Sequence, residues 1–137
     1  MSRIINSESA GKERTRLTKA IVLAIRELAK QSEPGDQARN LAAFIVIALT
    51  IVDQTIDVSV AAWEKRGYWV KADRFRMDWA WSGQAAEKMR IALQSDNWME
   101  VAQVAAMTGM KLNKITVPPG HRLGQPWVGA WKELQKR

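Results

Sequence analysis

Two carboxylates in the central part of the chain have a spacing that could support chemistry. Asp53 and Asp57 are four positions apart, so a helix would place both on one face. Bundle proteins use inward-facing carboxylates to hold paired metals, usually together with Glu-x-x-His motifs. The sequence contains no such motif. The candidate polar core therefore comprises Asp53, Asp57, Arg26 and Arg74, without a metal. We expect Asp57 to be solvated and Asp53 to pair with an arginine or lysine of a neighbouring helix, for example Arg26 or Arg74, because an unpaired charge at the edge of a core is costly.

A second candidate is a set of cations that could bind an anion or a nucleic acid. Four of them occur near the N-terminus and two more follow in the middle of the chain: Lys12, Arg14, Arg16, Lys19, Arg74 and Arg76. The second group lies near Trp63, Trp69, Trp79 and Trp81, and aromatic rings beside cations suit base stacking with phosphate contact. The competing interpretation is that the cations are solvated and the tryptophans belong to the core.

Several classes of site are absent from the sequence. There is no cysteine and only one histidine among the 137 residues, which argues against a disulfide framework and against thiolate or multi-histidine metal sites. No glycine-rich nucleotide loop and no Gly-x-Ser-x-Gly motif occurs. We therefore expect a non-enzymatic protein without a cofactor. Its net charge of +7 favours encounters with acidic partners.

The candidate residues must be positioned by helices, and the apolar run Leu41–Val52 indicates the central one. Asp36 is a suitable cap, and Gly67 can end the helix in the left-handed conformation, so a helix of about 30 residues is predicted. The uninterrupted apolar run is shorter than the roughly 20 residues that span a bilayer, and we expect neither a membrane span nor a membrane partner. Ala43 and Ile47 lie on a side that needs a cover.

Apolar residues at helical spacing predict three further long helices, over residues 9–31, 68–94 and 98–108. Ser82-Gly83 interrupts the third, indicating a kink, a break or a close helix crossing. The predicted fold is an all-α, up-and-down four-helix bundle with a long central second helix, followed by a C-terminal irregular arm and short helix. The chain forms a single helical domain over residues 1–137, with a flexible N-terminus at 1–8, the bundle at 9–109 and the arm at 110–137.

The arm contains Pro118-Pro119-Gly120, Gly124 and Pro126, which disfavour regular structure. Pro126 suits the first position of a helix. The final helix would carry Trp127 and Trp131, two large apolar surfaces that are costly to leave in water. We expect this helix to cover Ala43 and Ile47 or to dock on another subunit.

Together these features favour a cytoplasmic interaction or assembly module. We expect it to self-associate into a homo-oligomer, with a dimer favoured. The candidate interface comprises Ala43, Ile47, Trp127 and Trp131. An acidic protein or a nucleic acid is the alternative partner, which would make the chain a basic nucleic-acid-binding protein. A third alternative is a ligand-binding or enzymatic bundle with its polar core at Asp53 and Asp57.

Overall fold

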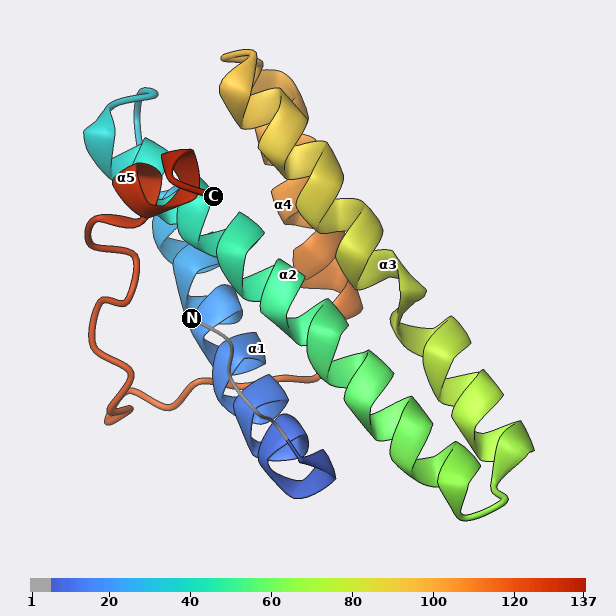
Figure 1. Cartoon of the computed structure of the whole chain (residues 1–137). Coiled ribbons are helices and arrows are strands. Elements are labelled where there is room, and N and C mark those ends of the chain that lie inside the picture. Colours follow the sequence, from blue (N-terminus) through green and yellow to red (C-terminus); the bar gives the residue numbers. More distant parts are fainter. Residues whose placement is uncertain (1–5) are drawn as a thin grey trace.

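The computed structural model describes residues 6–137, and this part of the chain is helical with irregular connections. Four long helices pack in contact and a short fifth helix follows (Figure 1). Their bounds are α1 Ser7–Ala29, α2 Asp36–Lys65, α3 Trp69–Gln94, α4 Trp98–Lys111 and α5 Ala130–Gln135. The predicted all-α bundle with a long second helix and a short C-terminal helix is confirmed.

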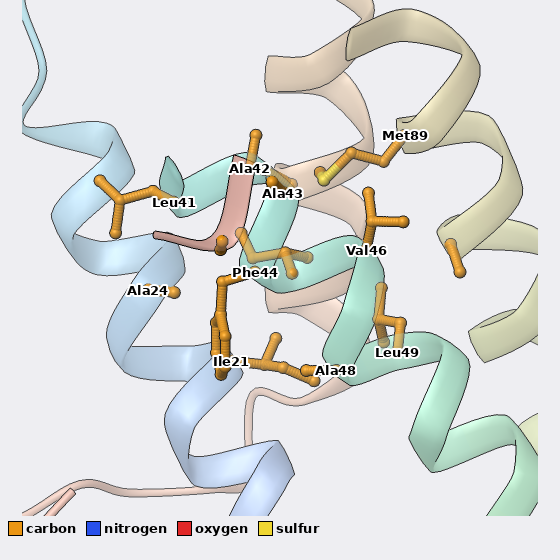
Figure 2. Packing of buried hydrophobic residues seen from close by; sticks show 14 of the residues in the cluster. Ile21, Ala24, Leu41, Ala42, Ala43, Phe44, Val46, Ala48, Leu49 and Met89 are labelled. Carbon is orange, nitrogen blue, oxygen red and sulfur yellow. The ribbon is translucent and has the colours of Figure 1, made fainter. Parts of the chain in front are cut away.

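The core is built around the first half of α2, which has neighbours on several sides. It packs against α1, α3 and α5. Figure 2 shows Ile21 and Ala24 of α1 on one side of α2, and Met89 of α3 on the other. Buried alanines such as Ala42 and Ala48 allow the neighbouring helices to approach closely. The apolar run therefore serves as the centre of the core, because nearly all of its side chains lose contact with water.

By length and composition, α2 is the one helix among residues 6–137 that could cross a membrane. A mostly buried core helix passes the same test. In this structure, 61% of the most apolar window of α2 is buried inside the protein. Its apolar character is thus used for packing against its own chain.

A capping box sets the start of α1. The Asn6 side chain accepts a hydrogen bond from the Ser9 backbone N–H at 2.8 Å, and the Ser9 hydroxyl accepts one from the Asn6 N–H at 3.1 Å. This capping box starts α1 at Ser7, two residues before the predicted start at residue 9. Residues 1–5 of the predicted flexible segment lie outside the described residues.

Two other predicted caps have clear outcomes. Gly35 is the N-cap of α2 and lacks a side-chain cap, so the prediction of Asp36 as cap was wrong. Gly67 does adopt a left-handed conformation, with φ of 83°, directly after the α2 C-cap Arg66. Asn97 caps α4, because its side chain accepts a hydrogen bond from the Glu100 N–H.

Neither Gly83 nor Gly109 ends a helix. α3 continues through Ser82-Gly83, and α4 continues past Gly109 to Lys111, so the predicted stop at Gly109 was wrong. Of the alternatives for Gly83, the structure shows a close crossing, because a Cβ added there would lie 2.8 Å from Asp53 Oδ2 on α2. Glycine allows α3 to pass over that carboxylate.

The arm after α4 is irregular and returns to the start of α2 (Figure 1). Leu112 and Val117 bury their side chains, and Leu123 lines a hollow with residues of α1. The final helix begins at Ala130, four residues after the predicted start at Pro126. Residues 126–129 form turns instead, and Gly129 has a left-handed φ of 77°.

Candidate functional site

The predicted interface residues lie beneath or within the C-terminal segment of the same chain. Ala43 and Trp127 are buried, and Ile47 and Trp131 are partly buried against the same core. The Trp131 backbone N–H donates a 3.0 Å hydrogen bond to the Asn40 side chain on α2. The side of α2 that needed a cover is therefore covered by α5, without a second subunit.

The predicted polar core does not bring its four members together. Asp53 lies partly buried at the crossing with Gly83, where burial, and secondarily the charge of Asp57, raise its pKa above the usual range. Arg26 and Arg74 are exposed. Within residues 6–137, neither arginine forms an ion pair with Asp53, so the predicted pairing was wrong. The same residues contain no group of three or more histidine or acidic side chains placed to hold a metal.

The four cations of α1 do converge. Lys12, Arg14, Arg16 and Lys19 line one shallow hollow of about 650 Å³, which Leu123 of the arm closes on one side. Two of these cations already have acidic neighbours on the same helix. Lys12 lies 3.5 Å from Glu8, and Arg16 lies 2.9 Å from Glu13. The α1 surface is therefore basic but partly neutralised.

Arg14 differs from the other cations because it is half-buried between three helices. Its Nη1 donates to the carbonyl and hydroxyl of Thr55 and to the hydroxyl of Ser59 on α2, at 3.4, 3.2 and 3.3 Å. Its guanidinium carbon lies 4.9 Å from the centre of the Phe75 ring on α3. Burial lowers the pKa of Arg14 below its ordinary value. These partners are all neutral, so the guanidinium is held in place without a carboxylate among the described residues.

The α3 cations and the tryptophans form a different arrangement from the predicted one. Arg76 pairs with Glu64 at 3.1 Å and with Asp73 at 3.2 Å, whereas Arg74 is exposed and forms no ion pair within residues 6–137. The rings of Trp63, Phe75, Trp79 and Trp81 make a continuous series of contacts and are partly buried. Most of the predicted aromatic surface is therefore occupied by packing, with Lys71 Nζ 4.6 Å from the Trp63 ring.

The turn between α2 and α3 presents an exposed apolar surface. Tyr68, Trp69 and Val70 are consecutive and 56, 63 and 74% exposed. Lys65 and Arg66 precede them and Lys71 follows. Figure 1 shows this turn at one end of the molecule, far from α5. We call residues 65–71 the hairpin tip. Three successive apolar residues beside a helix-ending glycine were the sequence signal for it, because they cannot all face one core.

No protein family, characterised protein or solved structure matches this chain.

Proposed function

We propose that this protein is a non-enzymatic helical module that binds an anionic membrane surface through its hairpin tip. The observation that carries the proposal is the exposure of Tyr68, Trp69 and Val70 between Lys65-Arg66 and Lys71. Tyrosine and tryptophan favour the headgroup level of a bilayer, and flanking cations are attracted to anionic lipids. Each such cation contributes about 1 kcal/mol near a charged leaflet.

Electrostatics argues against a second copy of the chain as the partner at this surface. A symmetric dimer would place each tip against an identical one. The three cations of one tip would then face those of the other, and the nearby acidic Glu64 already pairs with Arg76. Like charges across an interface oppose association. The face expected to drive self-association is also covered by α5, so we place the interaction at the tip instead.

The shape of the tip favours a bilayer over a nucleic acid strand. Successive helical residues differ in direction by about 100°, so Trp69 and Val70 at the start of α3 project in different directions, and Tyr68 precedes them as the non-helical N-cap. A membrane interface can surround such a projection, whereas stacked bases contact it from one side. Val70 has the largest exposed fraction of the three, and an aliphatic side chain lacks the flat face on which bases stack.

A matched pair of valine substitutions tests the proposal. Val70→Ser removes the aliphatic group at the tip, and Val128→Ser does so at an equally exposed position (71%) beside α5. We expect the wild type to sediment with vesicles of phosphatidylcholine plus phosphatidylserine and not with phosphatidylcholine alone. Loss of about 1.5 kcal/mol of apolar burial predicts roughly tenfold weaker binding for Val70→Ser. Equal binding by both variants, or no binding by the wild type, would refute the proposal.

A second candidate function is nucleic-acid binding, favoured by the convergence of Lys12, Arg14, Arg16 and Lys19 on one hollow. Four phosphate contacts on a single strand would give a slope of about −3 for log affinity against log salt concentration. Filter binding with single-stranded RNA across a salt series measures this slope. Absence of retention at low salt would exclude the candidate, and insensitivity to Lys19→Gln would exclude this hollow as the site.

A further inference from the structure

A small hollow lies where the start of α1 meets the end of α2. Its volume is about 210 Å³, below the roughly 300–1,000 Å³ of sites for drug-sized ligands. Two arginines and two serines from separate parts of the chain line it, together with one acidic residue and two apolar residues. The lining residues are Arg14, Arg66, Ser7, Ser59, Glu8, Ala62 and Trp63.

Arg14 enters this hollow with donors still available. All three of its hydrogen bonds use Nη1, so Nε and Nη2 have no acceptor within residues 6–137. The bonds to Thr55 and Ser59 and the contact with Phe75 already fix the side chain. A ligand would therefore meet an arginine whose conformational entropy has largely been lost during folding.

Arg66 provides the second cation of the lining. It is the C-cap of α2 and is exposed, and its side chain forms no ion pair within the described part of the chain. The acidic residue of the lining, Glu8, lies 3.5 Å from Lys12 and both side chains are largely exposed. Two arginines thus share a small hollow in which the nearest carboxylate is directed to a different cation.

We propose that this hollow is a binding site for a phosphate group, held by Arg14 and Arg66 with the hydroxyls of Ser7 and Ser59 as further donors. Arginine binds phosphate through parallel N–H donors, and such charge-assisted bonds are about twice as strong as neutral ones. The ligand class is a phosphomonoester, free or on a lipid headgroup. This inference goes beyond the proposed function, because a free phosphate could bind even if the protein never meets a membrane.

Calorimetric titration with inorganic phosphate tests the site directly. We expect binding by the wild type and at least tenfold weaker binding by Arg66→Gln, with no change for Arg26→Gln, which alters an exposed arginine of α1 outside the hollow. Glu8→Gln should bind several-fold more tightly, because it removes a negative charge from the lining. Arg14→Gln should also weaken binding, with thermal unfolding monitored because Arg14 contacts three helices.

Three results would overturn the inference. They are no phosphate binding by the folded wild type, equal affinities for Arg66→Gln and Arg26→Gln, and weaker binding by Glu8→Gln. Vesicles distinguish the source of the phosphate. If the ligand is a lipid headgroup, vesicles with phosphatidic acid should retain the wild type more strongly than vesicles with phosphatidylserine at equal charge. Equal retention by both kinds of vesicle, together with tight binding of inorganic phosphate, identifies a soluble ligand.

The two proposals fail separately. Phosphate binding without any vesicle binding would refute the membrane function and leave the phosphate site. Vesicle binding that depends on Val70, with no detectable binding of inorganic phosphate in the titration, would refute the phosphate site and leave the membrane function.

Discussion

The crossing of α2 and α3 predicts an unusual result for Gly83→Ala: its effect on stability should change sign with the residue at position 53. A Cβ at position 83 would lie 2.8 Å from Oδ2, 2.9 Å from Cγ and 3.0 Å from Oδ1 of Asp53. All three contacts are to the carboxyl group. Asp53→Ala removes that group, and no other atom lies as close to the added methyl group.

The magnitude follows from two opposing effects. Alanine is favoured over glycine in a helix by about 1 kcal/mol, while overpacking costs about 1–3 kcal/mol. In the wild-type background Gly83→Ala should therefore range from neutral to about 2 kcal/mol destabilising. In the Asp53→Ala background it should stabilise by about 1 kcal/mol, which raises Tm by roughly 4 °C for a chain of this size. The coupling energy is about 1–3 kcal/mol.

Urea unfolding of the four proteins, followed by circular dichroism near pH 7, measures this coupling. Gly109→Ala is the matched control. It also lies inside a helix, but the closest atom outside that helix, Ile25 Cγ2, is 3.8 Å from the added Cβ. It should stabilise by about 1 kcal/mol whichever residue occupies position 53. Equal effects of Gly83→Ala in both backgrounds would refute the close crossing.

Three further predictions concern the same core. Burial raises the folded-state pKa of Asp53, so the protonated carboxyl group favours the folded state. This contribution to the free energy of unfolding is complete below the unfolded pKa of about 3.9 and is lost as pH rises through the folded-state pKa. Asp53→Asn should then gain stability relative to the wild type as pH rises, and a pH-independent difference in urea unfolding would contradict this. Asn40→Ala removes the acceptor for the Trp131 N–H, so it should lower the free energy of unfolding by about 1 kcal/mol and speed proteolysis between residues 112 and 129. Proteolysis as slow as in the wild type would count against the docking of α5. Truncation after residue 125 should expose Ala43 and Ile47 and produce association in light scattering, whereas a stable monomer would show that this face needs no cover.

The helices could be predicted from sequence because their signals are local. The apolar run Leu41–Val52, the left-handed Gly67 and the Asn97 cap each act within a few residues. Boundaries were less accurate where a competing local signal decided the result. Asn6 starts α1 earlier than the apolar pattern indicates.

The candidate sites depended on relations between helices that periodicity does not contain. The spacing of the α1 cations predicted their convergence, but nothing local indicated that Arg14 would reach Thr55 and Phe75. Asp53 was expected to pair with an arginine, yet its position is explained by a glycine thirty residues later. Arg66 and Arg14 share a hollow only because α2 is long enough to return to the start of α1.

Fluorescence from a single labelled cysteine tests the proposed membrane function most directly. The chain contains no cysteine, so Val70→Cys and the control Val128→Cys can each carry one environment-sensitive dye at a defined position. With phosphatidylcholine–phosphatidylserine vesicles, we expect the dye at position 70 to shift to the blue and become protected from an aqueous quencher, while the dye at position 128 stays unchanged. An unchanged dye at position 70, or equal shifts at both positions, would contradict insertion of the hairpin tip.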